Sequence, residues 1–183
     1  MTKRPIFITG NQNKANYLAK TLGIDLDHQK LDLEEIQSIS LEEIVEYKVK
    51  QAYAIIKEPV LVEDVALKFT ALGELPGPFI KFFIESPDGL EKLCRILDSF
   101  DDRSARAECV FGYYDGVELQ MIRGGLDGDI ARHPRGRTGY GFDRIFQPDG
   151  CGGRTRAELD EDEDIRTYRI MKPFEALKEF LES

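Results

Sequence analysis

Apolar and polar residues follow one another along the chain in a pattern that predicts an α/β fold. Residues 5–9 form a short apolar run of strand type, which Gly10 ends. Residues 13–22 then place apolar side chains at helical spacing, and Gly23 follows as a terminating residue. A strand, a polar turn and a helix in this order are typical of the first elements of an α/β domain.

The clearest helix is predicted over residues 41–57, where Ser40 can cap the first turn and Glu43 follows three residues later. At about 100° per residue, one face of this helix collects its apolar residues. They are Leu41, Ile44, Val45, Val49, Ala52, Ile55 and Ile56. Lys48 falls in the middle of this apolar face. A lysine there must be paired, reach water along its aliphatic stem, or point into a cleft. We favour a cleft lysine that meets an anion over one that only reaches water.

Two later patterns predict strands. Residues 60–62 form a fully apolar run that we expect to end at Glu63-Asp64. Residues 105–113 alternate between apolar and polar side chains, and Asp115-Gly116 provides a turn into a second strand at 117–122. Alternating strands around an Asp-Gly turn are a strong signal of a β-hairpin.

The rest of the chain completes the predicted fold class. A further helix is expected around residues 90–97, and a last helix begins at Pro173. Residues 127–140 are rich in Gly and Arg and predict a loop. The fold class is therefore α/β, with a mixed central sheet flanked by helices. The length of 183 residues fits a single domain over 1–183.

Composition and charge narrow the function. The chain has 25 Lys and Arg against 34 Asp and Glu, a formal net charge of −9, which argues against gripping duplex nucleic acid by its phosphates. No apolar run approaches the ~20 residues that span a bilayer, and no long apolar segment opens the chain as in a signal peptide. The 3 scattered cysteines predict free thiols in a reducing cytoplasm, and with only 2 histidines they argue against a zinc site.

Two kinds of polar stretch beside predicted strands could hold a phosphate and a metal. Residues 9–14 lie at the start of the first helix, where backbone N–H groups and Lys14 attract anions, although an ordinary turn fits equally well. Glu63-Asp64 follows an apolar strand, and Glu34-Glu35 follows an alternating stretch. Open α/β sheets place ligands at strand ends, and carboxylate oxygens suit Mg²⁺. Solvated surface carboxylates are the simpler interpretation of either pair.

Two aromatic stretches could hold a base. Residues 73–83 combine turn residues with Lys81 inside an aromatic cluster, and residues 140–143 place two aromatics and a carboxylate in a glycine turn. Aromatic faces stack on bases, and a carboxylate can accept hydrogen bonds from base N–H groups. Either stretch could instead be a packed loop. Together, phosphate lysines, metal carboxylates and a base-stacking loop indicate a nucleotide polyphosphate.

These stretches also form an ordered series of motifs. They are Thr-Gly-Asn-x-x-Lys at 9–14, Glu35-x-Gln37, Lys48 in its helix, Val-Leu-Val-Glu-Asp at 60–64, Leu-Pro-Gly-Pro-Phe-Ile-Lys at 75–81, Tyr-Gly-Phe-Asp at 140–143 and Phe-Gln-Pro-Asp-Gly at 146–150. Over nearly the whole chain they resemble the inosine triphosphate pyrophosphatase family, which hydrolyses non-standard purine nucleoside triphosphates. The resemblance implies two lobes with a nucleotide cleft between them.

The resemblance also implies a role for each matching residue. It assigns triphosphate contacts to Thr9, Gly10, Asn11, Lys14, Lys48 and Lys81. It makes Glu35 and Asp64 the Mg²⁺ ligands, with Asp64 also placed to activate the attacking water. It assigns the base site to Tyr140, Gly141, Phe142 and Asp143. The expected catalytic residues are therefore Asp64, Lys14 and Lys48.

The chain departs from the family pattern in two places. Val65 follows Asp64 where the family has a hydroxyl residue, so only a backbone contact with substrate is expected there. Near the end, Glu163 and Tyr168 replace a lysine and a histidine that belong to the family's base site, whereas Arg169 remains. Glu163 either reverses the charge near the base or points to solvent in an acidic loop at 160–164.

The sequence therefore predicts a cytoplasmic, Mg²⁺-dependent enzyme that converts triphosphates such as ITP, dITP and XTP to the monophosphate and pyrophosphate. The resemblance implies a homodimer, and neither duplex nucleic acid nor a membrane is an expected partner. One alternative is the same reaction on a modified or specialised nucleotide. Another is a nucleotide-binding protein that has lost turnover, against which the intact Glu35 and Asp64 argue.

Overall fold

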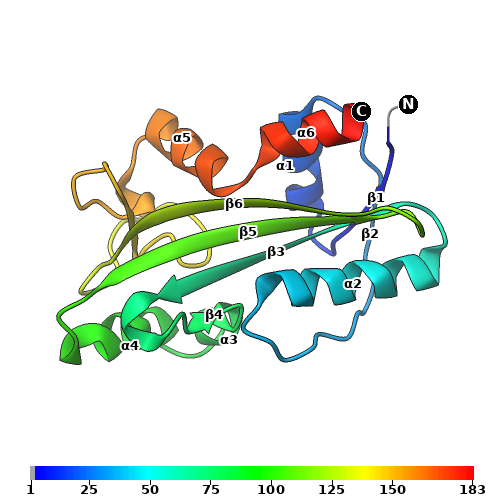
Figure 1. The fold of residues 1–183 in the computed structure, drawn as a ribbon. Coiled ribbons are helices and arrows are strands. Elements are labelled where there is room, and N and C mark those ends of the chain that lie inside the picture. Colours follow the sequence, from blue (N-terminus) through cyan, green and yellow to red (C-terminus); the bar gives the residue numbers. More distant parts are fainter. Residues whose placement is uncertain (1–2) are drawn as a thin grey trace. The chain divides into compact units, whose positions relative to one another are not determined.

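The computed structural model describes residues 3–183 as a mixed α/β chain (Figure 1). In chain order its helices and strands are β1 (Ile6–Ile8), α1 (Gln12–Leu22), β2 (His28–Gln29), α2 (Leu41–Ile56), β3 (Val60–Phe69), β4 (Pro76–Gly77), α3 (Ile80–Ile84), α4 (Gly89–Ile96), β5 (Ser104–Tyr114), β6 (Leu119–Ile130), β7 (Phe146–Pro148), α5 (Glu161–Met171) and α6 (Phe174–Glu182). Single 3₁₀ turns lie at Thr70–Leu72, Leu97–Ser99 and Arg156–Glu158. No helix within residues 3–183 is both long and apolar enough to cross a membrane.

The strands form one seven-stranded mixed sheet, which confirms the predicted fold class. Its order is β2-β1-β3-β5-β6-β7, and β4 pairs with β3 outside this path. β1 runs parallel to both β2 and β3, whereas β7 runs antiparallel to β6. Because Phe7 of β1 is level with Leu61 of β3, β1 ends while β3 continues beside the turn that follows Ile8.

The chain packs as two compact units, each built from separate segments. Unit 1 contains residues up to Asp64, Cys109–Arg123 and Pro173–Ser183. Within it, α1 and α6 cover one face of the strands and α2 covers the other (Figure 1). The two sides of its core come from apolar helix faces, with Leu18 of α1 and Leu177 of α6 on one side and Val45 of α2 on the other, all fully or almost fully buried.

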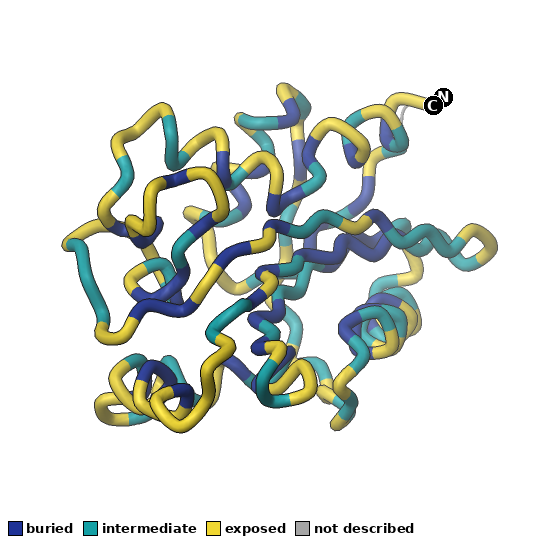
Figure 2. The backbone as a smooth tube through the Cα atoms, turned by 60° about the vertical axis from the view of Figure 1, so that its left-hand side comes forward, coloured by how far each residue is buried: buried dark blue, intermediate teal, exposed yellow. Residues whose placement is uncertain are grey.

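Unit 2 contains Val65–Glu108 and Gly124–Lys172 and has its own hydrophobic core. Apolar residues of β3, α3, α4, β5 and β6 meet there with residues of the loop before β7. Phe142 of that loop and Phe146, the first residue of β7, pack edge-on, with ring centroids 6.2 Å apart. In both units the buried positions follow the strands and the inward helix faces, while turns and outer helix faces are exposed (Figure 2).

Most predicted elements are confirmed. Helices α1, α2, α4 and α6 occupy the four predicted helical segments, and β5 and β6 form the predicted hairpin. Ser40 caps α2 as expected, because its side chain accepts a hydrogen bond from the backbone N–H of Glu43. Gly23 ends α1 in the left-handed conformation, at φ 68°, which glycine adopts without a steric penalty. Within residues 3–183, Cys94, Cys109 and Cys151 are not joined in disulfides, in agreement with the prediction.

Three predicted boundaries were wrong. β3 does not end at Glu63-Asp64, because the apolar residues that follow are buried and carry the strand on to Phe69. β6 extends to Ile130, so the first residues of the predicted loop at 127–140 pair with β7 instead. The acidic stretch at 160–164 begins helix α5 rather than a loop, because Asp160 and Glu163 cap each other's backbone.

Candidate active site

Two neighbouring carboxylates of β3 carry the centre of the site in unit 1. Successive side chains of a strand point to opposite faces, so Glu63 and Asp64 face different helices. Glu63 forms an ion pair with Lys14 of α1, at 3.2 Å from Nζ, and Asp64 accepts a hydrogen bond of 3.0 Å from Lys48 of α2. The strand thus places one lysine–carboxylate pair on each face, just beyond the end of β1.

Lys48 joins the two carboxylates that the sequence assigns to a metal. Its Nζ lies 2.9 Å from Glu35 Oε1 and 3.0 Å from Asp64 Oδ2. Only 16% of its side chain is exposed. Burial alone would lower the pKa of Lys48, but the two carboxylates outweigh burial and raise the pKa above its usual value. Of the three possibilities for this lysine, the structure thus shows a paired one.

The side chain of Glu63 is buried at 2% exposure and holds Lys14 in place. It also accepts a hydrogen bond from the Cys109 thiol of β5, at 3.7 Å. Sequence reasoning grouped Glu63 with Asp64 as a possible metal pair and missed its contacts with Lys14 and Cys109, because these residues are distant along the chain.

The turn between β1 and α1 is fixed by its own side chains. Thr9 Oγ1 accepts a hydrogen bond from the N–H of Asn11, and Asn11 Oδ1 caps α1 by accepting from the N–H of Lys14. A Cβ added at Gly10 would lie 3.1 Å from the aliphatic chain of Lys30, which places a further lysine over the turn. Nothing in the pattern around Lys30 distinguishes it from a surface lysine, so sequence reasoning missed it.

Unit 2 contains the residues assigned to the base. The turn at 140–143 closes on itself, because Asp143 Oδ2 accepts a 2.7 Å hydrogen bond from the N–H of Tyr140. Tyr140 is 87% exposed, whereas Phe142 is 6% exposed and belongs to the core of the unit. The expectation that both aromatics offer a stacking face was therefore wrong, and Tyr140 alone can offer one. The sequence could not separate these roles, because both residues follow a glycine.

Glu163 has two local partners in the structure. Its carboxylate accepts hydrogen bonds of 2.8 and 2.6 Å from Arg154, and its Oε2 accepts from the N–H of Asp160 at the start of α5. The hydrogen bonds from Arg154 lower the pKa of Glu163 below its usual value. Glu163 thus stabilises the first turn of α5.

The other predicted residues of unit 2 lie in different surroundings. Lys81 is exposed on α3, and Arg169 is exposed on α5. Val65 and Tyr168 are partly buried against the hydrophobic core. Tyr168 has two cations close to its ring, with Arg156 Cζ 5.0 Å and Lys172 Nζ 4.8 Å from the ring centre.

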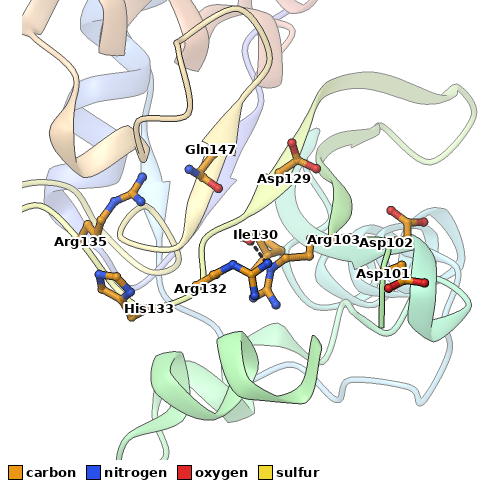
Figure 3. Close-up of a pocket in the computed structure, with 9 residues that line it drawn as sticks. All are labelled: Asp101, Asp102, Arg103, Asp129, Ile130, Arg132, His133, Arg135 and Gln147. Carbon is orange, nitrogen blue, oxygen red and sulfur yellow. Dashed lines mark hydrogen bonds between the residues drawn. The ribbon is translucent and has the colours of Figure 1, made fainter. Parts of the chain in front are cut away.

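A separate surface pocket of about 570 Å³ lies in unit 2 (Figure 3). None of the predicted site residues lines it. Arg103 at its centre donates to the carbonyls of Ile130, Ala131 and Cys94, so this guanidinium serves the fold. Arg135 at its edge is likewise bonded to Glu158.

The sequence pattern of residues 5–182 matches the model of the Ham1 family. The chain belongs to the Ham1 family. It is 45% identical over 176 residues to inosine triphosphate pyrophosphatase 2 of Trypanosoma cruzi, covering 93% of this chain and 88% of that protein. It is 39% identical to the inosine triphosphate pyrophosphatase of Scheffersomyces stipitis, with 97% of each chain covered.

Solved structures agree with this membership. The Ham1 protein of Staphylococcus aureus superposes with a TM-score of 0.84 at 26% identity, covering 98% of both chains. The Ham1 protein of Coxiella burnetii gives the same score, identity and coverage. Membership of the Ham1 family implies a divalent metal cofactor, and the two carboxylates on Lys48 are the residues whose chemistry fits one.

Proposed function

We propose that this Ham1 protein hydrolyses non-standard purine nucleoside triphosphates, such as ITP, dITP and XTP, to the monophosphate and pyrophosphate, with Mg²⁺ as cofactor. The observation that carries the proposal is the contact of one half-buried ammonium, that of Lys48, with both Glu35 and Asp64. It marks a point where two carboxylates converge on a single cation. The names and identities of the two pyrophosphatase relatives support the same reaction.

The donor set fits a small divalent cation. Glu35 Oε1 and Asp64 Oδ2 both lie within 3.0 Å of the same positive nitrogen, so one cation can contact both carboxylates. Mg²⁺ binds through one or two carboxylates and takes its other ligands from water and phosphate oxygens. No group of three or more His, Cys, Asp or Glu suited to a metal occurs within residues 3–183, which agrees with a site completed by the substrate. Bound there, Mg²⁺ would supply positive charge that offsets the triphosphate.

The protein residues of unit 1 would bind and orient the triphosphate. Lys14 and Lys48 would contribute positive charge, and the N-terminal end of α1 would favour an anion. Asp64 would accept a proton from the water that attacks the α-phosphorus, and pyrophosphate would leave. Such transfer depends mainly on positioning and on neutralising charge, which lysines can provide. We also assign a phosphate contact to Lys81 of unit 2, on the basis of the family resemblance.

The residues of unit 2 would recognise the base. Tyr140 offers an exposed ring for stacking, and Asp143 offers carboxylate oxygens that can accept from a ring N–H. We also assign Gly141, Tyr168 and Arg169 to this site, as well as the backbone of Val65. We expect Glu163 to affect base preference only weakly, because Arg154 already neutralises its charge.

We also propose that the enzyme is a cytoplasmic homodimer. Three cysteines that form no disulfide within the described residues suit a reducing compartment. The dimer rests on resemblance to the pyrophosphatase family.

The test is a substrate panel of ITP, XTP, GTP and ATP with the purified chain, in Mg²⁺ and in excess chelator. We expect pyrophosphate release from ITP and XTP that requires the metal. Asp64→Asn should reduce turnover at least about 1,000-fold while the protein still folds, because an amide binds the metal weakly and cannot accept the proton. Asp25→Asn, at an exposed position in unit 1, is the control. Nucleotide binding without pyrophosphate release in the wild type would contradict the proposal.

A further inference from the structure

Arg156 is a buried cation that no part of the proposed chemistry uses. It lies in the 3₁₀ turn Arg156–Glu158 and is 3% exposed. Its guanidinium donates to Asp143 Oδ1 at 3.1 Å and to Asp164 Oδ1 at 2.5 Å. Its Nε is buried and has no hydrogen-bond partner among residues 3–183. Burying an arginine with one donor unsatisfied is costly, so the two ion pairs must offset that cost.

The first ion pair fixes the turn that carries Tyr140. Asp143 Oδ2 already accepts from the Tyr140 N–H, and Arg156 holds the other oxygen, Oδ1. The backbone is tied at the same place, because the N–H of Ala157 donates to the carbonyl of Asp143 at 3.1 Å. Both oxygens of Asp143 therefore have a fixed donor, and their remaining lone pairs point in fixed directions.

The second ion pair connects this turn to α5. Asp164 and Tyr168 are one helical turn apart, so both reach the same guanidinium from one face of the helix. Lys172, a further turn along and 5% exposed, lies against the Tyr168 ring. Ion pairs made by a buried arginine seldom add more stability than well-packed apolar residues would, so the geometry that these pairs impose explains their use here better.

We propose that Arg156 is a positioning residue that sets base selectivity, by holding the Asp143 carboxylate as a fixed hydrogen-bond acceptor beside Tyr140. The inference rests on the proposed function, because it assumes that a purine is bound at the 140–143 turn. Hypoxanthine, xanthine and guanine carry a hydrogen on N1, whereas adenine N1 is itself an acceptor. An ionised carboxylate accepts from the first group and repels the lone pair of adenine.

The charge around Asp143 explains why Arg156 is needed. Burial raises the pKa of Asp143, and the Arg156 charge opposes that rise. The hydrogen bond from the Tyr140 N–H and the charge of Lys172 also lower the pKa of Asp143, whereas the charge of Asp164 raises it, and the net pKa stays above its usual value. Without Arg156, Asp143 would hold its proton to higher pH. It would then donate a hydrogen bond, which adenine N1 can accept.

The experiment compares selectivity in wild type, Arg156→Met and Arg156→Lys. The readouts are the ratio of kcat/KM for ITP to that for ATP, and the ratio of equilibrium affinities for IMP and AMP. We expect Arg156→Met to lower both ratios about tenfold, mainly through the ITP KM, with a much smaller change in kcat. Arg156→Lys keeps a charge but bonds fewer oxygens, so it should give intermediate ratios.

The residual selectivity of Arg156→Met should also rise with pH more steeply than that of the wild type, because Asp143 ionises only at higher pH in the variant. The matched control is Arg135→Met, which removes another arginine bonded to the same 3₁₀ turn, through Glu158 at 3.0 Å. It should leave both ratios within about twofold of wild type. A purely structural role for Arg156 would predict equal effects from the two variants.

Folded Arg156→Met with wild-type ratios would overturn the inference. If that variant does not fold, Asp164→Asn takes its place, because Asp164 is 46% exposed and its amide keeps the side-chain shape. Unchanged ratios in both Asp164→Asn and Arg156→Lys would then overturn it. If the wild type binds IMP selectively but releases no pyrophosphate, the proposed function is contradicted. The role of Arg156 is then tested by the ratio of affinities for IMP and AMP alone. A wild type that binds no purine nucleotide would overturn both.

Discussion

The sequence indicates that Lys48 occupies an unusual position, but it does not indicate which residues pair with it. Its position on the apolar face of α2 predicts an ammonium that is paired, reaches water along its stem or points into a cleft, of which we favoured the cleft. The structure pairs it with Glu35 and Asp64, which lie 13 and 16 positions away along the chain. Sequence spacing cannot show such contacts, because they depend on how α2 packs against β3.

We expect Lys48→Met to separate folding from activity. The free energy of unfolding should stay within about 1 kcal/mol of wild type, because partly exposed ion pairs contribute little and methionine suits the apolar face. The value of kcat/KM should fall about 100-fold, because the triphosphate loses a cation. Lys50→Met, which removes an exposed ion pair with Glu46 on the same helix, is the control. A large loss of stability with unchanged KM would indicate a structural lysine instead.

Substitution of Glu35 tests its proposed role as a metal ligand. Its side chain is 51% exposed, so Glu35→Gln should not disturb folding. The Mg²⁺ concentration for half-maximal activity should rise about tenfold, because one of two charged ligands is lost. Glu34→Gln removes the neighbouring carboxylate, which bonds to Tyr47 Oη, and should leave the metal requirement unchanged. Equal metal requirements in the two variants would argue against Glu35 as a ligand.

The buried position and the ion pairs of Arg156 could not be predicted from the sequence. Its partners Asp143 and Asp164 are 13 and 8 positions away and belong to different elements. An isolated arginine in a polar stretch resembles any surface arginine until the turn at 140–143 and α5 are in place.

At the scale of elements, α4 depends on a close approach that only glycine allows. A Cβ added at Gly89 would lie 1.6 Å from the carbonyl oxygen of Phe83 and 2.8 Å from Ser86 Oγ. We therefore expect Gly89→Ala to destabilise the protein by about 2 kcal/mol and to lower Tm by several degrees. Gly150→Ala provides a comparison, since its added methyl meets nothing within 4 Å although φ is +76°. It should cost only about 1 kcal/mol. Equal melting temperatures for the two variants would contradict this account.

The elements that the sequence predicted well have local signals. α1, α2 and α6 have apolar faces and terminating or capping residues, and the hairpin has an Asp-Gly turn. The misjudged elements depend on tertiary contacts. β3 continues past two charged residues because each finds a lysine on its own face, and β6 continues because β7 pairs with it. The start of α5 did carry a local signal, the Asp160-x-x-Glu163 capping box. We interpreted the stretch as a solvated loop because it is so acidic.

At the scale of the whole molecule, the fold class and family could be predicted because ordered motifs extend along nearly the entire chain. Light scattering of the purified chain tests the proposed homodimer. We expect about twice the 20.8 kDa mass of one chain at micromolar concentration. The chain has a formal charge of −9, so the measurement should be made in physiological salt, which screens the repulsion between copies. A mass of one chain that persists at high concentration would contradict the dimer.

In the proposed reaction, water attacks the α-phosphorus in the site formed by Lys14, Lys48, Glu35 and Asp64. The most direct measurement is hydrolysis of ITP in ¹⁸O-labelled water with Mg²⁺, followed by mass spectrometry of both products. Attack at the α-phosphorus would leave one ¹⁸O atom in inosine monophosphate and none in the released pyrophosphate. Label in pyrophosphate, or release of inosine diphosphate with labelled phosphate, would contradict it.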